Sequence, residues 1–158
     1  MGRLAHVGLG ANLGDTRAAL LRATDELGRL RDTRLLRVSS FYCSAPLDAQ
    51  GPDYLNAVVE LDTGLEPLEL LAELQRLESA AGRDRPYRNA PRVLDLDLLV
   101  YAELQCATPV LTVPHPRLAE RAFVLRPLAE IAPGLVIPGL GPVVDLLAGV
   151  AGQRVDRL

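Results

Sequence analysis

The order of its strand and helix patterns predicts that this chain adopts an α+β fold of the ferredoxin-like type, β-α-β-β-α-β. Such a fold places two helices on one face of an antiparallel sheet. Two observations lead to it: apolar residues alternate within the strand segments, and they recur every three or four positions within the helical segments. The 158 residues are expected to form one domain, residues 1–158, that buries roughly two-thirds of its unfolded surface.

The first half of this pattern is a strand, a helix and a second strand. Residues 4–9 are expected to form the first strand, which ends at a glycine-containing turn. Asp15 or Thr16 can cap a helix over residues 16–30. Residues 35–43 are β-branched and apolar enough for the second strand. The helix has an apolar stripe at helical spacing, formed by Leu20, Ala23, Leu27 and Leu30.

The second half continues with a loop, a strand and a helix. Residues 44–53 contain proline, glycine and small polar residues, which favour a loop. Residues 54–62 are expected to form the third strand and to pair with the second as a long-looped hairpin. The next helix begins near Glu66, has Pro67 at the favoured first position and ends at Gly82. Its apolar stripe consists of Leu70, Leu74, Leu77 and Ala81.

The last third of the chain, from Ala102 on, is rich in proline and less regular. We expect an irregular helical segment that starts near Pro116. Pro127 is expected to interrupt it, because proline lacks the N–H that a helix interior requires. A short last helix is expected over residues 144–147.

The fourth strand, residues 93–101, carries two carboxylates among apolar residues. Successive side chains of a strand alternate between its faces, so Asp95 and Asp97 should point the same way, about 6–7 Å apart. Two carboxylates in a buried-looking strand are costly unless a partner compensates their charge. Mg²⁺ is such a partner, since it binds one or two carboxylates together with substrate phosphates. The opposite face of the strand is expected to hold Leu94, Leu96, Leu98 and Val100.

An arginine-rich loop directly precedes the acidic strand. Guanidinium groups have a planar fork of donors that suits phosphate oxygens. The acidic pair and this loop together therefore predict a site for a metal–polyphosphate. The alternative is a surface strand with two solvated aspartates beside a solvated basic loop, which would be preferred for the spaced aspartates without the arginine loop. The arginines of the loop are Arg83, Arg85, Arg88 and Arg92.

The composition excludes several classes of protein. The net charge is −3, which argues against a broad nucleic-acid surface. All 17 basic residues are arginines, so a P-loop lysine, a kinase strand lysine and a Schiff-base lysine are ruled out. No apolar run approaches the ~20 residues of a membrane span, and no signal-peptide pattern is present. Cys43 and Cys106 are expected to be free thiols in a reducing cytoplasm.

Two functions without catalysis are alternatives to an enzyme. An RNA-recognition module would need exposed stacking aromatics in a basic-aromatic run, and the chain has only six Phe and Tyr residues and no such run. A nucleotide-sensing regulatory module without turnover stays open as the alternative. A measurable product from ATP would separate that module from an enzyme.

The chain resembles the 6-hydroxymethyl-7,8-dihydropterin pyrophosphokinase family over nearly its whole length. The proline-arginine pair followed by two spaced aspartates, with Val-Pro-His downstream, is highly specific. The matching pieces are GLGANLGD at 8–15, SSFY at 39–42, PDYLNA at 52–57, Arg83 with Arg85, APRVLDLDL at 90–98, VPH at 113–115, and RAF at 121–123 followed by PLAEIAP at 127–133.

The resemblance implies transfer of a pyrophosphoryl group from ATP to the 6-hydroxymethyl group of the reduced pterin, with release of AMP, as a step of folate biosynthesis. ATP would bind with two Mg²⁺ ions held by Asp95 and Asp97, which bridge the triphosphate and the acceptor hydroxyl. Arg83 and Arg92 match the family's phosphate-clamping arginines and are assigned a catalytic role. The resemblance places on the nucleotide side Glu78, Arg85, Arg88, Leu98, Leu111, Thr112, His115 and Arg121. Leu98 and Leu111 can equally be explained as core residues.

For the pterin, Asn56 matches the residue that hydrogen-bonds the amide edge of the ring. Tyr54 and Phe123 match aromatic neighbours that would enclose the ring, although Phe123 can also be explained as core filler. The loop that contacts pterin polar groups corresponds to Ser44, Ala45 and Leu47.

The chain departs from the family pattern just before Pro91. Many members carry Trp-Gly there, whereas this chain has Asn89 and Ala90. Since that tryptophan helps close the loop over the pterin, Tyr87 is a candidate replacement. We expect a cytoplasmic monomer that binds only the small-molecule substrates, neither nucleic acid nor membrane.

Overall fold

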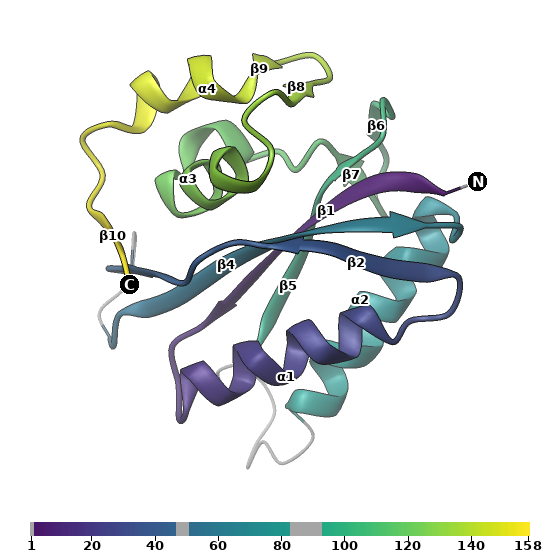
Figure 1. The fold of residues 1–158 in the computed structure, drawn as a ribbon, viewed down its shortest axis with the longest axis horizontal. Coiled ribbons are helices and arrows are strands. Elements are labelled where there is room, and N and C mark those ends of the chain that lie inside the picture. The colour runs from purple at the N-terminus through teal and green to yellow at the C-terminus, as the bar shows by residue number, and fades with distance from the viewer. Residues whose placement is uncertain (1, 47–50, 83–92) are drawn as a thin grey trace.

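The computed structural model describes residues 2–46, 51–82 and 93–158. In these ranges four α-helices and ten strands follow one another (Figure 1). The helices are α1 (Thr16–Gly28), α2 (Pro67–Ala81), α3 (Ala122–Ile131) and α4 (Val143–Leu146). The strands are β1 (Arg3–Ala11), β2 (Thr33–Val38), β3 (Tyr42–Ser44), β4 (Tyr54–Thr63), β5 (Asp95–Tyr101), β6 (Cys106–Ala107), β7 (Thr112–Val113), β8 (Val136–Ile137), β9 (Gly141–Pro142) and β10 (Val155–Arg157). None of the described helices is long and apolar enough to cross a membrane.

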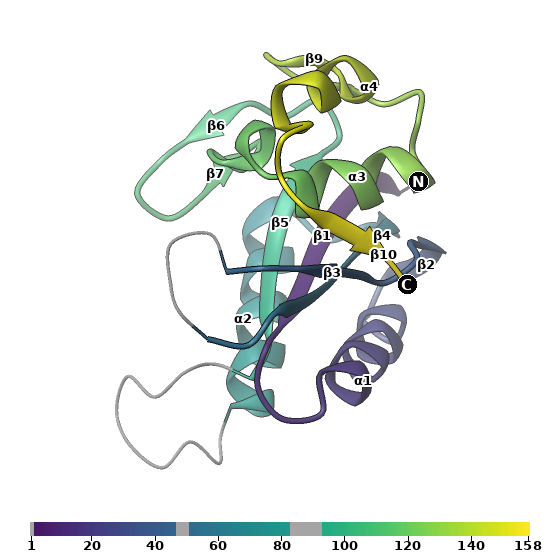
Figure 2. The same cartoon turned by 90° about the vertical axis from the view of Figure 1, so that its left-hand side faces the viewer.

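The main sheet is antiparallel and six-stranded, which confirms the predicted α+β class. Its order is β10-β3-β4-β1-β5, and β2 pairs with the part of β4 that β3 leaves open. Helices α1 and α2 cover one face, as predicted. Helix α3 and α4 lie over the opposite face (Figures 1 and 2). The irregular last third of the chain therefore supplies a third layer.

The two long helices begin and end close to the expected positions for the expected reasons. Asp15 is the N-cap of α1, and its side chain accepts a hydrogen bond from the N–H of Ala18. Helix α2 begins at Pro67, and Glu66 before it forms a capping box with Glu69. Their apolar stripes pack in one core with the strands above them, since Leu20, Leu27, Leu70, Leu74 and Leu77 are all buried there.

The prediction of one continuous strand over residues 35–43 is wrong. Beside β4, the Ser39 hydroxyl accepts from the N–H of Val58, while the Ser39 N–H donates to the Val58 carbonyl. A side chain thus replaces a backbone group in the ladder, and the strand is interrupted between β2 and β3. Glu130 in α3 then accepts from both the N–H and the hydroxyl of Ser40. Glu130 thereby accepts hydrogen bonds from the Ser40 donors at the point where the strand is interrupted.

The expected position of Val100 is also wrong. Leu98 pairs with Val7 and Val100 with the adjacent His6, so Leu99 is an extra residue in β5. This bulge reverses the alternation of faces. Leu96 and Leu98 pack with α1 and α2 as predicted, whereas Val100 packs on the α3 side.

The helix expected from Pro116 begins later and is not interrupted. A 3₁₀ turn spans Leu118–Glu120, Arg121 is extended, and α3 then starts at Ala122. Pro127 lies inside α3 without ending it, and it is one of the buried residues of this helix. The short last helix is α4, followed by a 3₁₀ turn over Leu147–Val150, close to the prediction.

Candidate active site

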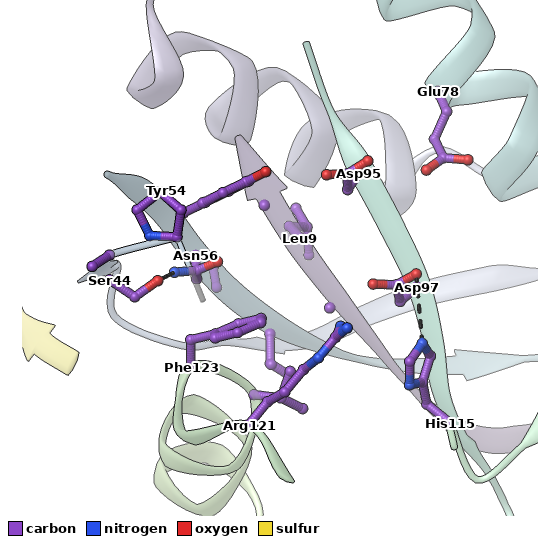
Figure 3. A pocket seen from close by; sticks show the side chains of 17 residues that line it. Leu9, Ser44, Tyr54, Asn56, Glu78, Asp95, Asp97, His115, Arg121 and Phe123 are labelled. Atoms are coloured by element: carbon purple, nitrogen blue, oxygen red, sulfur yellow. Dashed lines mark hydrogen bonds and ion pairs between the residues drawn. The ribbon is translucent and has the colours of Figure 1, made fainter. Parts of the chain in front are cut away.

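A pocket of about 420 Å³ opens on the α3 side of the sheet (Figure 3). It lies where the N-terminal end of α3 approaches strands β3, β4, β1 and β5. One end is aromatic and amide-bearing, and the other end is acidic (Figure 3). Its lining consists of Gly8, Leu9, Gly10, Ser44, Ala45, Pro46, Tyr54, Asn56, Ala57, Val58, Glu78, Asp95, Asp97, His115, Arg121, Phe123 and Val124.

Two glycines of β1 form the floor of this pocket. Gly10 lies in register between Asn56 on β4 and Asp95 on β5, and Gly8 lies between Val58 and Asp97. A methyl group at Gly10 would stand 3.4 Å from Asn56 Oδ1, and a larger side chain would occupy the space above the strand. Since alternate residues share a face, glycine at both positions leaves a hollow between the amide and the two carboxylates.

The acidic end confirms that Asp95 and Asp97 share one face of β5. Both side chains point into the pocket (Figure 3). Glu78 of α2 accepts a 2.9 Å hydrogen bond from the N–H of Leu96, the residue between them. This contact fixes the beginning of β5 to α2. Glu78 therefore has a structural role in addition to its place in the lining.

His115 stands beside Asp97 with its orientation fixed by the backbone. The N–H of Arg117 donates to His115 Nδ1 at 3.1 Å, so in the neutral ring the proton resides on Nε2. Nε2 lies 3.9 Å from Asp97 Oδ1. Burial lowers the pKa of His115; Asp97 opposes this shift, and Arg121 and Arg117 reinforce it. At neutral pH, His115 thus presents an N–H donor toward the acidic end.

The opposite end presents an amide whose orientation is also fixed. Asn56 is 3% exposed, and its Nδ2 donates to Ser44 Oγ at 2.7 Å. Asn56 Oδ1 therefore remains on the pocket side, above Gly10. It can accept a hydrogen bond from a ligand N–H. Tyr54 and Phe123 stand on either side of this amide (Figure 3).

Arg121 lies between the two ends. It is the residue before α3, and its guanidinium lies 5.5 Å from the centroid of the Phe123 ring. Figure 3 shows the guanidinium reaching toward Asp97 and His115. A cation at this point can contact an anionic group of a ligand bound in the pocket.

The structure brings ten of the predicted site residues to this one pocket: Ser44, Ala45, Tyr54, Asn56, Glu78, Asp95, Asp97, His115, Arg121 and Phe123. Three others do not line it. Leu98 and Leu111 are buried in the core with α1 and α2, and Thr112 pairs with Ala107 in the small β6–β7 sheet. The described residues do not include Leu47, Arg83, Arg85, Tyr87, Arg88, Asn89, Ala90 and Arg92.

The expected end of the first strand at residue 9, with Gly10 in the following turn, is wrong: β1 extends to Ala11, so that Gly8 and Gly10 both lie in the strand and form the pocket floor. Gly8 and Gly10 carry no functional group, and only their spacing of two within a strand pattern signals a face kept free of side chains. Pro46, Ala57, Val58, Val124 and Leu9 complete the walls. Their apolar side chains give no chemical signal in the sequence.

A metal site built only from protein ligands is not seen among the described residues. There, no group of three or more His, Cys, Asp and Glu side chains is placed to hold an ion. Asp95 and Asp97 are hard oxygen ligands beside an open floor. This arrangement suits a metal that takes its remaining ligands from phosphate and water.

Comparison with known proteins relates residues 6–133 to a family model described as 7,8-dihydro-6-hydroxymethylpterin-pyrophosphokinase (HPPK). A protein of Pseudomonas aeruginosa named 2-amino-4-hydroxy-6-hydroxymethyldihydropteridine pyrophosphokinase is 44% identical over 154 residues, covering 97% of this chain and 95% of its own. A protein of the same name from Haemophilus influenzae is 41% identical over 155 residues, covering 98% and 97%.

Among solved structures, the fold is similar to a crystal structure of Plasmodium falciparum HPPK-DHPS, wild type, with pterin and p-hydroxybenzoate. The TM-score is 0.73 at 12% identity, over 94% of this chain and 43% of that one. The chain thus spans less than half the length of that solved protein. At this identity the likeness concerns the fold alone.

Proposed function

The chain belongs to the 7,8-dihydro-6-hydroxymethylpterin-pyrophosphokinase family, and from this premise we propose how its pocket divides the work of the family's reaction. The protein transfers pyrophosphate from ATP to the 6-hydroxymethyl group of 6-hydroxymethyl-7,8-dihydropterin. The products are AMP and the pterin diphosphate, and the step belongs to folate biosynthesis.

The amide end of the pocket is proposed to hold the pterin. Asn56 Oδ1 faces the pocket because Ser44 engages the other side of the amide, so it would accept from the pterin's N–H groups. Tyr54 and Phe123 would enclose the ring from two sides. The loop of Ser44, Ala45 and Leu47 would contact the remaining polar edge.

The acidic end is proposed to hold two Mg²⁺ ions on Asp95 and Asp97. The fit rests on two carboxylates that project beside glycines, where phosphate oxygens have room to approach. When bound, the metal neutralises triphosphate charge and aligns the acceptor oxygen with phosphorus. Among the chain's own groups, the Nε2–H of His115 would donate to a phosphate oxygen.

The nucleotide side is assigned to residues both inside and outside the described ranges. Arg121 would contact the charge that lies between pterin and phosphates. The resemblance assigns the phosphate clamp to Arg83 and Arg92, with a nucleotide-side role for Arg85, Arg88, Glu78, Leu98, Leu111 and Thr112. Since Leu98 and Leu111 are core residues of the α1–α2 face, we propose that they support the site from behind.

The reaction then depends mainly on positioning. The hydroxymethyl oxygen attacks the β-phosphorus and its proton passes to solvent, while the bond between the β-phosphorus and the bridging oxygen that AMP retains breaks. Transfer of this kind places charge on phosphate oxygens and is accelerated chiefly by alignment and electrostatics.

The observation that best supports this proposal is the register of Asn56, Gly10 and Asp95 in one row across the sheet. It sets the Asn56 amide and the Asp95 carboxylate on either side of an open floor.

The decisive experiment is incubation with ATP, Mg²⁺ and the reduced hydroxymethylpterin, followed by nucleotide analysis. AMP in pterin-dependent amounts is the expected result. ADP would indicate an ordinary kinase, and absence of pterin-dependent turnover would contradict the proposal. The same assay decides against the alternative of a non-catalytic nucleotide-sensing module, which no comparison favours.

Several broader assignments are also proposals. The pairing order β5-β1-β4-β2 supports the ferredoxin-like designation of the sheet. A single pyrophosphokinase domain over residues 1–158, a monomeric state and a cytoplasmic location are expected for a protein of this activity. Sedimentation at micromolar concentration tests the monomer directly.

A further inference from the structure

Arg121 must satisfy two demands at the same position. Its side chain enters the pocket, yet its backbone is the N-cap of α3, with φ −124° and ψ 111°. The first turn of a helix has N–H groups without intrahelical partners, and a Ser, Thr, Asp or Asn at the N-cap normally satisfies one of them. An arginine has no acceptor to do so, and α3 indeed has no side-chain cap from Arg121.

A residue from the far end of the chain supplies the missing contact. Gln153 Oε1 accepts from the N–H of Ala122 at 2.9 Å, and Gln153 Nε2 donates to the carbonyl of Glu120 at 2.7 Å. One side-chain amide thus bridges the backbone on both sides of Arg121. Because both its donor and its acceptor are engaged, this amide restrains the direction in which the Arg121 Cα–Cβ bond leaves the chain.

The segment that carries Gln153 is itself attached to the pocket wall. Two residues further on, Val155 pairs with Ser44 in the β10–β3 ladder, and Arg126 of α3 donates to the Val155 carbonyl. The C-terminal segment therefore joins the helix that carries Arg121 to the strand that carries Ser44. Gln153 lies beyond residues 6–133, the part that matches the family model.

We propose that Gln153 is a positioning residue for the reaction, acting through Arg121. It supplies the helix cap that an arginine cannot, and so allows a guanidinium to occupy the N-cap position and enter the pocket. This inference rests on the proposed function, in which Arg121 contacts the phosphate side of the ligands. A residue that only stabilised α3 would affect folding but would show no specific dependence on Arg121.

The test is a double-mutant cycle on the full chain. Gln153→Met keeps the length of the side chain and removes both hydrogen bonds. We expect kcat/KM to fall roughly 3- to 10-fold, the size expected for about one net hydrogen bond. Gln105→Met, the same substitution at an exposed glutamine outside the pocket lining, is the control and should stay within about twofold of wild type.

The cycle separates positioning from stability. In an Arg121→Met background, adding Gln153→Met should change kcat/KM by less than about twofold, because the group that Gln153 positions is gone. An equal fall in both backgrounds, or no fall in either, would overturn the inference. If Gln153→Met does not fold, Gln153→Glu replaces it, since a carboxylate keeps the acceptor for Ala122 and loses the donor to Glu120.

The same variants distinguish this inference from the proposed function. Failure of the wild-type chain to form AMP counts against the reaction and leaves Gln153 untested by kinetics. The cycle is then measured as affinity for the magnesium complex of a non-hydrolysable ATP analogue, which requires no turnover. Non-additive weakening by Gln153→Met and Arg121→Met supports positioning, and additive weakening contradicts it.

Discussion

The hydroxyl of Tyr42 on β3 donates a 2.7 Å hydrogen bond to Glu130 Oε1 of α3. Burial raises the pKa of Tyr42 to about 12, with Glu130 acting in the same direction, so the phenol remains a donor at any physiological pH. Tyr42 pairs in register with Asn56. This contact therefore connects the helix that covers the sheet to the strand pair that forms the amide end of the pocket.

Glu130→Ala should destabilise the protein by about 1–3 kcal/mol, because it leaves several donors without their acceptor. These are the Tyr42 hydroxyl and the N–H and hydroxyl of Ser40. Urea denaturation followed by circular dichroism measures the change. Glu103→Ala, at an exposed glutamate, is the matched control and should shift the free energy of unfolding by less than about 0.5 kcal/mol. Equal effects of the two substitutions would mean that Glu130 is only a surface charge.

Gly10→Val should abolish pterin binding while the fold persists. Valine suits a strand better than glycine does, but its side chain would enter the floor between Asn56 and Asp95, where the added Cβ alone would lie 3.4 Å from Asn56 Oδ1. Titration calorimetry with the pterin checks the affinity, and thermal unfolding checks the fold. Gly134→Val is the control, since a Cβ there meets nothing within 4 Å. Retained pterin affinity in Gly10→Val would show that the ring does not lie over this strand.

The sequence predicts the helices well because their signals are local. Asp15 caps α1, and Pro67 starts α2, from positions adjacent to the turns they organise. The wrong predictions of strand structure occur where contacts with residues distant in the sequence determine the backbone. The Ser40 N–H at the break between β2 and β3 donates to Glu130, which lies 90 residues away in the sequence. The bulge at Leu99 changes the register of β5 against β1. A run of apolar residues fits the register with the bulge and the register without it equally well, so the sequence does not indicate which one forms.

The predictions of site residues divide in the same way, into those that follow from local sequence signals and those that depend on residues distant in the sequence. Aspartates at alternate positions predict a shared face from strand geometry alone, and Asp95 and Asp97 indeed line one pocket. The same alternation places Leu98 on the opposite face, where it is found, so its side chain supports the site from behind and does not line the pocket. Gln153 could not have been chosen from the sequence. Its importance arises from two backbone contacts that exist only after the chain has folded.

His6 should make the protein less stable as the pH falls. Its side chain is 1% exposed, Nε2 lies 2.9 Å from Glu60 Oε2, and Nδ1 has no hydrogen-bond partner among the described residues. Burial lowers the pKa of His6, although Glu60 opposes the shift. The Nε of Arg37 lies 3.9 Å from the other oxygen of Glu60, Oε1.

The direction in which pH changes the free energy of unfolding follows from the protons bound by His6 in the folded and unfolded chains. Below about pH 6.5 the unfolded chain protonates His6 and the folded chain does not, so the free energy of unfolding decreases as the pH is lowered. The slope should approach but not exceed about 1.4 kcal/mol per pH unit for this residue. Denaturation between pH 8 and 5 should give a flatter profile for His6→Gln. His115→Gln is measured in parallel, because burial lowers the pKa of that residue too. Profiles of wild type and His6→Gln that run parallel would contradict the prediction.

Asp95→Asn and Asp97→Asn should each lower turnover by on the order of 100-fold or more, because each removes one formal charge from the ligands of a doubly charged ion. Binding of the pterin should survive, since Asn56, Tyr54 and Phe123 stand at the other end of the pocket (Figure 3). The two readouts are the rate of AMP formation at saturating Mg²⁺ and the quenching of pterin fluorescence. Asp145→Asn, at an exposed aspartate in α4, controls for the loss of a carboxylate as such. Near-normal rates in either pocket variant would show that its carboxylate does not hold a metal. Loss of pterin binding together with turnover would mean that the acidic and amide ends of the pocket are not separate.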